Sequence, residues 1–225
     1  MFFAPFLAFY AIVFFLLLTF FFVLLEIHVI NYAFVTLGLP PELAFVALLA
    51  SLIGSYINIP ITRVAIGQPH PAEVVRSFGI GYRVPTRYVT DSTIVAVNVG
   101  GAIVPILISV YLLMQMPSII VPALIGVAIV TAIVHRFAIP VPGLGIATPM
   151  LIPPIVAALC GYFLGSSDHH RDAVAFISGV VGTLIGADLL NLRKLRDLGA
   201  PVASIGGAGT FDGIFLTGIV AVLLA

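Results

Sequence analysis

The sequence predicts an all-α protein, a polytopic transmembrane helical bundle of about seven spans, and three observations lead to this fold class. Of the 225 residues, 61% are hydrophobic and 8% are charged, and the mean hydropathy is +1.26. The apolar runs are close to the roughly 20 residues that a helix needs to cross a bilayer. They show no sustained alternation of apolar and polar residues, so helices are expected and not the strands of a closed barrel.

The N-terminal part is expected to hold two spans. Residues 5–25 are rich in Phe and Leu, lack a basic region before them and precede no small-residue cleavage site, so we interpret them as a membrane helix and not as a signal peptide. Residues 26–39 carry Glu26, His28 and Asn31 and are expected to form an interfacial turn. Pro40-Pro41-Glu42 is a typical helix start, because proline is tolerated in the first turn and an acid is favoured there. The second span then reaches about Asn58.

The middle of the chain contains the only long hydrophilic stretch, residues 61–91. We interpret it as a cytoplasmic loop within a single integral membrane domain that covers residues 1–225. The third span is expected over residues 92–116. Pro117 and Ser118 then turn the chain into a fourth span that ends near Val134.

The C-terminal part is expected to complete the bundle with spans at about 150–164, 173–190 and 206–225. Residues 139–149 are apolar but rich in Pro and Gly, which makes them a poor helix. They are expected to form a re-entrant or interfacial loop packed on protein. The sequence leaves open whether this stretch and residues 200–209 enter the membrane.

The distribution of basic residues orients the bundle. With the N-terminus inside and the C-terminus outside, only Arg171 falls on the outer side, as the positive-inside rule for short loops requires. The inner side then carries the other eight basic residues: Arg63, Arg76, Arg83, Arg87, Arg136, Arg193, Lys194 and Arg196. The expected location is the cell membrane.

Composition also limits the partners and cofactors. The formal net charge is zero and charged residues are few, so a nucleic-acid-binding surface is not expected. The single Cys160 cannot form an intrachain disulfide. The adjacent His169 and His170 lie in a polar turn and are expected to be solvated, so no metal site is expected. No cofactor is expected either. The expected partners are the lipid bilayer and either a transmembrane peptide substrate or a small solute; the oligomeric state is left open.

Two carboxylates in apolar segments are the candidate catalytic residues. Asp188 lies near the end of the sixth expected span and Asp212 near the start of the seventh. At a rise of about 1.5 Å per residue they lie roughly 7 Å and 9 Å inside the same membrane face, on antiparallel helices. An acidic residue within a membrane segment is costly and by default indicates function. Asn98, Asn58 and Asn191 fall in the same half of the membrane, so we expect a water-accessible cavity that opens to the cytoplasm.

Two neighbouring carboxylates share one proton, because both cannot ionise cheaply. The ionised group can act as a general base on water while the protonated group donates to a substrate carbonyl oxygen. Glycines 206, 207 and 209 would let a substrate backbone approach closely, or let the seventh helix begin irregularly. The candidate substrate-binding residues are Asn98, Asn191, Gly207 and Gly209.

The segment GAGTFDGIFLTG resembles the aspartate-bearing helix of intramembrane aspartyl proteases of the presenilin and signal-peptide-peptidase type. The resemblance covers about 40 residues and would make Asp212 the aspartate of the glycine motif and Asp188 its partner. The chain departs from the family pattern, since Gly209-Thr210-Phe211 precedes Asp212 and no Pro-Ala-Leu comes after it. Over nearly its full length from the second span onward, the chain resembles a domain-of-unknown-function family of small prokaryotic multi-pass membrane proteins, through NVGGAIVP, GADLLNL and GGAGTFDGIFLTG. That second resemblance implies no activity.

The sequence leaves two other functions open. An intramembrane acid pair with asparagines and broken helices also fits a proton- or cation-coupled transporter of small solutes. A non-catalytic membrane scaffold would use the glycine-rich faces for helix association. In a purely structural interpretation, a snorkelling arginine neutralises Asp188. Asp212 would then serve as the N-cap of the seventh helix.

Overall fold

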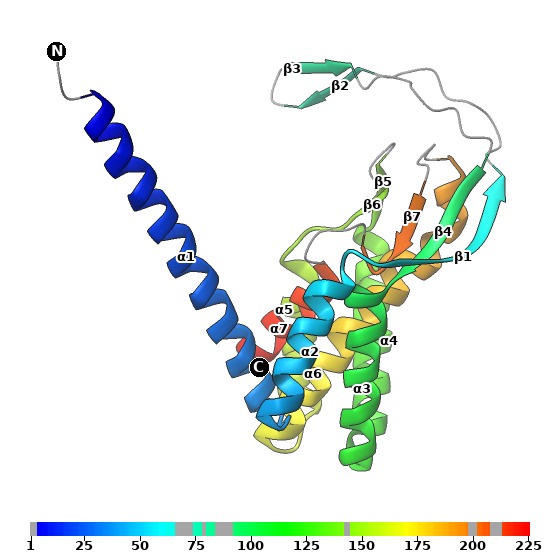
Figure 1. Ribbon diagram of the computed structural model, residues 1–225. Helices are drawn as coiled ribbons and strands as arrows, with labels where there is room; N and C mark the ends of the chain where they lie inside the picture. The colour runs from blue at the N-terminus through cyan, green and yellow to red at the C-terminus, as the bar shows by residue number, and fades with distance from the viewer. Residues whose placement is uncertain are drawn as a thin grey trace.

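The computed structural model describes residues 4–65, 74–77, 80–83, 92–141, 145–197, 202–207 and 213–225. Within them the chain is mostly helical and carries short strands (Figure 1). The α-helices are α1 (Ala4–Thr36), α2 (Pro41–Gly54), α3 (Val104–Gln115), α4 (Ile120–Phe137), α5 (Ile152–Leu164), α6 (Asp168–Thr183) and α7 (Gly213–Leu224). Shorter π- and 3-10-helical segments are η1 (Val99–Ile103), η2 (Pro117–Ile119), η3 (Leu184–Asp188) and η4 (Leu189–Asp197). The strands are β1 (Asn58–Ala65), β2 (Val74–Ser77), β3 (Ile80–Arg83), β4 (Ser92–Asn98), β5 (Ile139–Val141), β6 (Gly145–Ala147) and β7 (Val202–Ile205).

Helix α6 is the centre of the helical core. Ser167 caps its N-terminus by accepting from the His170 N–H, and residues 173–180 are all buried. The helix packs against α3, α4, α5 and α7. Small residues permit this close packing: a Cβ at Gly182 would lie 2.7 Å from Val130 of α4. Such tight apolar contact is typical of helices that associate through small residues.

A three-stranded sheet lies at one end of the helices, in the order β1-β4-β7. β4 pairs antiparallel with β1 and parallel with β7. The β4 segment is rich in β-branched residues, which favour a pleated and half-buried surface. Two hairpins, β2-β3 and β5-β6, lie at the same end (Figure 1).

The helical part of the predicted class is confirmed, but the sheets show that all-α is too narrow a description. The expectation of a third span over residues 92–116 is wrong in its first part, because Ser92–Asn98 is a strand and the helical segment begins only at Val99. A short buried strand and the start of a buried helix are both continuous apolar runs, and periodicity does not separate them.

Other boundaries also differ from the expectation. Residues 26–36 continue α1 and do not form an interfacial turn, because a few polar side chains do not break helical hydrogen bonding. Strand β1 begins within the expected end of the second span and extends into the hydrophilic stretch 61–91. The stretch 139–149 contains the β5-β6 hairpin. The seventh helix does not start at residue 206, because Gly206 and Gly207 are not helical, and within the described residues it covers Gly213–Leu224.

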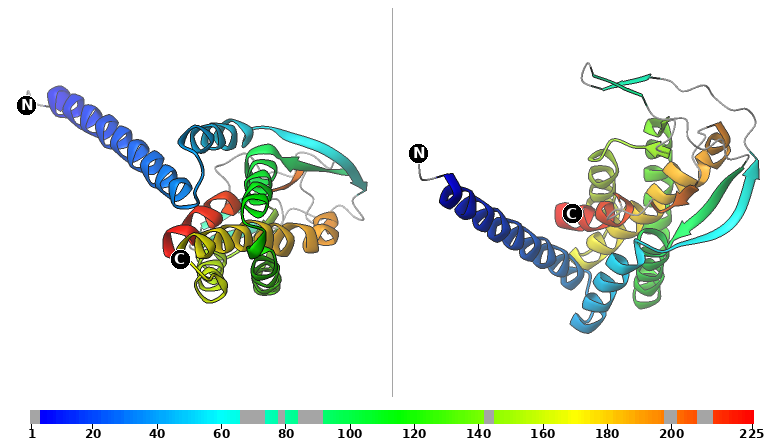
Figure 2. Two further views of the ribbon diagram at one scale, coloured as in Figure 1. Left: turned by 90° about the horizontal axis from the view of Figure 1, so that it is seen from below. Right: turned by 45° about the horizontal axis from the view of Figure 1, so that its top comes forward.

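The elements have a clear polarity along the bundle. The sheet and hairpins lie at one end of helices α2–α6, which we call the strand end (Figure 1). The α1-α2, α3-α4 and α5-α6 connections lie at the opposite end, which we call the turn end (Figure 1). Helix α1 extends away from the bundle in all views (Figures 1 and 2). In the described part of the chain, Pro117–Phe137 and Asp168–Leu192 are long and apolar enough to cross a membrane.

Candidate functional site

Asp188 lies where the hydrogen-bond pattern of α6 changes. The helix passes into the π-helix η3, which ends at Asp188, and then into the 3-10 helix η4. A π-helical turn within a helix is rare and occurs frequently at functional sites. The carboxylate is therefore carried by an irregular segment inside an otherwise regular core helix.

Side chains around η3 satisfy the carbonyl groups near this irregular segment. Thr131 Oγ1 of α4 donates to Gly182 O at 3.2 Å, and His135 Nδ1 of α4 contacts Gly186 O at 3.3 Å. Asn191 Nδ2 donates to Gly186 O at 3.0 Å and to the next carbonyl along the chain at 2.9 Å. Because a carbonyl oxygen can only accept a hydrogen bond, we assign His135 Nδ1 as the donor to Gly186 O. These contacts hold the segment that ends at Asp188.

A backbone N–H from another element orients the carboxylate. Gly206 N donates to Asp188 Oδ2 at 2.8 Å. Gly206 and Gly207, directly after β7, have φ values of 87° and 99°, a region that L side chains rarely adopt. A Cβ at Gly206 would also lie 2.6 Å from the Cβ of Ala102. Glycine is therefore required where the chain turns back toward Asp188.

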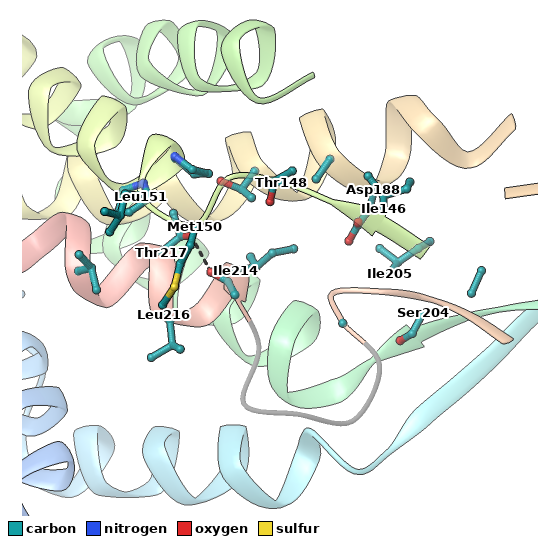
Figure 3. Close-up of a pocket in the computed structure, with 18 of the residues that line it drawn as sticks. Ile146, Thr148, Met150, Leu151, Asp188, Ser204, Ile205, Ile214, Leu216 and Thr217 are labelled. Carbon is teal, nitrogen blue, oxygen red and sulfur yellow. Dashed lines mark hydrogen bonds between the residues drawn. The ribbon is translucent and has the colours of Figure 1, made fainter. Parts of the chain in front are cut away.

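Asp188 borders a cavity of about 330 Å³, at the lower end of the volumes of ligand-binding pockets, roughly 300–1,000 Å³. Figure 3 shows Asp188, Ile146, Ile205 and Ser204 toward one end of it and Met150, Leu151, Ile214, Leu216 and Thr217 toward the other. Its walls come from β6, the start of α5, the end of α6 with η3, β7 and α7. The cavity thus joins the helical core to the sheet.

The lining is mostly apolar with a few polar groups. Asp188 is the one ionisable residue among the described residues that line it. The hydroxyl-bearing residues of the wall are Thr148, Thr183, Ser204 and Thr217. Two of these hydroxyls have partners in the chain: Ser204 Oγ donates to Asn58 Oδ1, and Thr217 Oγ1 donates to Gly213 O. An apolar cavity with a small number of convergent polar groups is the usual form of a small-molecule site.

Two of the predicted site residues line this cavity, Asp188 and Gly207. Asp212 and Gly209 lie outside the described residues. However, Gly207 and Gly213, which flank the segment 208–212, both line the cavity. The catalytic pairing of Asp188 with Asp212 therefore stays a prediction.

The two predicted asparagines are bonded within the fold and are not among the residues that line the cavity. Asn98 is 1% exposed. Its Oδ1 accepts from Gly101 N at 2.8 Å, and its Nδ2 donates to Ser55 O at 2.7 Å and to Asn58 Oδ1 at 3.1 Å. Asn191 is held against η3 by its two bonds to backbone carbonyls. Their substrate-binding role stays a prediction, while the contacts give both a role in the architecture.

Sequence reasoning missed most of the polar wall of the cavity. Thr183 carried a signal, since it is a polar residue five positions before Asp188 in the same apolar segment. Thr148 and Ser204 carried none, because their place depends on how the β5-β6 hairpin and β7 pack against the helices. Among the described residues, no three His, Cys, Asp or Glu side chains come together as metal ligands.

The fold and the cavity define a helix-rich protein with a small sheet at one end. Where the helices meet the sheet lies a mostly apolar cavity bordered, among the described residues, by one carboxylate, that of Asp188. Comparison of families assigns it more closely: the chain belongs to the family described as "Protein of unknown function (DUF1614)", whose model matches residues 52–224. The family resemblance noted from the sequence is thereby confirmed. No curated protein and no solved structure matches the chain significantly, so the local resemblance to intramembrane aspartyl proteases receives no support from the comparisons.

Proposed function

We propose that the chain is a multi-pass protein of the cell membrane with about seven spans, its N-terminus inside and its C-terminus outside. Large apolar side chains cover the outer faces of the helices: Phe45 of α2, Leu124 of α4 and Phe163 of α5 are all exposed, by 57%, 63% and 75%. In the apolar stretch Pro117–Phe137, only 28% of the most apolar 18 residues are buried. A helix surface of this kind requires an apolar environment.

The positions of the basic residues support this orientation. Arg63 in β1, Arg136 at the end of α4 and Lys194 in η4 are exposed and belong to elements at the strand end (Figure 1). Arg171 lies close after the α5-α6 connection at the turn end. Under the positive-inside rule the strand end faces the cytoplasm.

We further propose that the protein is an intramembrane hydrolase of the aspartyl-protease type, with Asp188 and Asp212 as its catalytic carboxylates. One observation carries this proposal: the Asp188 carboxylate borders a cavity whose wall also includes Gly207 and Gly213, the residues on either side of the segment that holds Asp212. Asp212 is joined to the cavity-lining Gly213 by a single peptide bond.

The chemistry rests on two carboxylates that share one proton. The ionised carboxylate takes a proton from water as the water oxygen attacks the carbonyl carbon of a peptide bond, and the protonated carboxyl donates to the carbonyl oxygen. The C–N bond of the tetrahedral intermediate then breaks: the leaving nitrogen takes the proton held by one carboxyl group, and the hydroxyl made from the carbonyl oxygen returns its proton to the other carboxylate, which restores the pair. In this scheme the Gly206 N–H fixes the orientation of the Asp188 carboxylate.

The test is proteolysis by the purified protein in liposomes, with a library of transmembrane peptides as substrates and mass spectrometry of the products. Asp188→Asn keeps an oxygen for the Gly206 N–H, so the fold is expected to survive while cleavage falls by at least about 100-fold. Asp212→Asn is expected to have the same effect. Asp168→Asn is the matched control, because its exposed carboxylate lies at the far end of α6. Cleavage that is absent in the wild type, or equal in all variants, would overturn the proposal.

The transporter is the second candidate, and a specific observation favours it. The helical hydrogen-bond pattern is irregular at two places, the π-helical segments η1 before α3 and η3 after α6. In addition, α7 follows the strand β7 in the chain. Discontinuous helices around an acidic residue are typical of ion-coupled carriers. If this candidate is correct, the same liposomes show solute flux driven by a proton or sodium gradient, Asp188→Asn abolishes that flux, and no peptide is cleaved.

A further inference from the structure

The Asp188 carboxylate has one oxygen that the described part of the fold leaves unpartnered. Its Oδ2 accepts from Gly206 N at 2.8 Å. Among the described residues no group donates to Oδ1, and Oδ1 is not one of the fully buried side-chain atoms that lack a partner. This oxygen therefore keeps accessible surface. Since Asp188 lines the cavity, Oδ1 is available to a molecule bound there.

The charge of this carboxylate is not balanced by the described wall of the cavity. Asp188 is the one ionisable residue among the described lining residues, and the basic Arg136 and Lys194 are exposed elsewhere at the strand end. A carboxylate in apolar surroundings is costly unless it is paired. If Asp188 shares a proton with Asp212, the pair still carries one negative charge. A positively charged group on the bound molecule would complement it.

The hydroxyl groups of the wall also favour a ligand that donates hydrogen bonds. The hydroxyl protons of Ser204 and Thr217 are already donated to oxygens of the chain, so these groups can only accept from a ligand. Thr183 Oγ1 is fully buried and does not reach the cavity. Thr148 is the one remaining hydroxyl-bearing residue among the described lining residues. The polar side chains of this wall therefore mainly accept hydrogen bonds.

An organic ammonium ion fits this wall better than a metal ion does. Hard metal cations such as Ca²⁺ take about six to eight oxygen ligands, whereas the described wall is mostly apolar and carries one carboxylate. An ammonium group has donors and no acceptor. Toward the end of the cavity away from Asp188, the side chains include Met150, Leu151 and Leu216 (Figure 3). That end suits an apolar substituent on the ammonium nitrogen.

We propose that the Asp188 cavity binds a primary ammonium ion with an apolar substituent, whose N–H group donates to Asp188 Oδ1. The cavity of about 330 Å³ accommodates a small molecule of this kind. The inference goes beyond the proposed hydrolase, since it does not require peptide cleavage. It also names the class of solute that the transporter candidate would carry.

Three compounds with the same apolar ring test whether the cavity recognises the charge: cyclohexylammonium, cyclohexanol and cyclohexanecarboxylate. The thermal midpoint of the purified protein in detergent is measured against the concentration of each, with sodium chloride as the control for ionic strength. Cyclohexylammonium is expected to raise the midpoint and to bind at least about 10-fold more tightly than cyclohexanol, because a hydrogen bond to a charged group contributes more than a neutral one. Cyclohexanecarboxylate is expected to cause no shift.

Asp188→Asn tests whether this carboxylate is the partner of the ammonium ion. The variant removes the negative charge and keeps an oxygen for the Gly206 N–H, so it is expected to bind cyclohexylammonium no more tightly than cyclohexanol. Asp168→Asn is the matched control. Its exposed carboxylate lies at the opposite end of α6, so this variant is expected to keep the preference of the wild type for the ammonium ion.

Contrary results are clear at each step. Equal affinity of the wild type for cyclohexylammonium and cyclohexanol, or no binding of cyclohexylammonium, overturns the proposal even if Asp188→Asn does not fold. A preference that persists in folded Asp188→Asn places the ammonium ion at another site. Failure of the hydrolase is a separate outcome: a protein that prefers the ammonium ion but cleaves no peptide keeps this inference, and one that cleaves peptides without this preference loses it.

Discussion

The N–H of Gly206 reaches Asp188 only because two successive glycines adopt positive φ after β7. At the scale of the residue, the sequence had indicated that glycines here would permit close approach or an irregular helix start. The structure shows a related purpose: the turn delivers a backbone donor to a carboxylate on another element. The glycine content of the segment indicated an unusual backbone conformation. The partner of the Gly206 N–H could not be predicted, because it depends on tertiary packing.

Substitution of Gly206 by alanine is expected to combine two penalties. Positive φ costs a residue with a Cβ about 1–2 kcal/mol, and the new Cβ would also collide with Ala102. Gly38→Ala carries only the first penalty, since Gly38 has φ 75° and nothing within 4 Å of its Cβ position. Gly213→Ala carries neither. Thermal unfolding in detergent should therefore rank the losses of stability as Gly206 above Gly38 above Gly213, and equal losses at Gly206 and Gly38 would contradict the collision.

At the scale of the element, the junction of β4 with η1 explains why the predicted third span is wrong in its first part. The segment reads as one apolar run, and only the polar Asn98 marks the change from strand to helix. Asn98 closes the strand, caps η1 through Gly101 N and bonds to Ser55 after α2. From sequence, this asparagine inside an apolar run was interpreted as a substrate-binding group; that role stays a prediction, and its contacts add this joining role.

Asn98→Asp is expected to be more destabilising than its size suggests. An aspartate retains the acceptor for Gly101 N but loses the donors to Ser55 O and Asn58 Oδ1, and it places a negative charge beside those two oxygens. Each buried partner left unsatisfied costs about 1–3 kcal/mol. Chemical denaturation in detergent measures the loss, and Asn31→Asp, at an exposed position of α1, is the control. A stability equal to that of the control would show that the junction does not depend on these bonds.

The segment η3 gives a second prediction at this scale. Asn191→Ala removes the donors to the carbonyls of Gly186 and Ala187, so the amides of Leu184–Asp188 are expected to exchange hydrogen faster while those of residues 173–180 in the core of α6 stay protected. Hydrogen exchange followed by mass spectrometry resolves the two peptides. Faster exchange along the whole of α6, or no change at η3, would show that Asn191 does not hold this segment locally.

At the scale of the whole molecule, hydropathy and charge were sufficient to predict a mostly helical chain with apolar helix faces. They did not predict the sheet, because β4 and β7 pair across more than 100 residues of chain and neither sequence alternates apolar and polar residues. The cavity was equally out of reach in detail: Asp188 was found from its cost in an apolar segment, but the hairpin and strand that form the opposite wall are placed by tertiary contacts alone.

The seven-span arrangement makes a prediction about which end of the molecule faces the cytoplasm. Single cysteines are placed at Thr62 in β1, at the strand end, and at Ser118 in the α3-α4 connection, at the turn end, both of them exposed, in a background where Cys160 is alanine. A membrane-impermeant maleimide added to intact cells is expected to label Ser118→Cys at once and Thr62→Cys only after the membrane is permeabilised, because in the proposed arrangement η1 with α3 crosses the bilayer between them. Detergent-solubilised protein labels both and controls for access to each thiol. Labelling of both sites from outside, or of Thr62→Cys alone, would rule out this orientation, and with it a strand end whose basic residues face the cytoplasm.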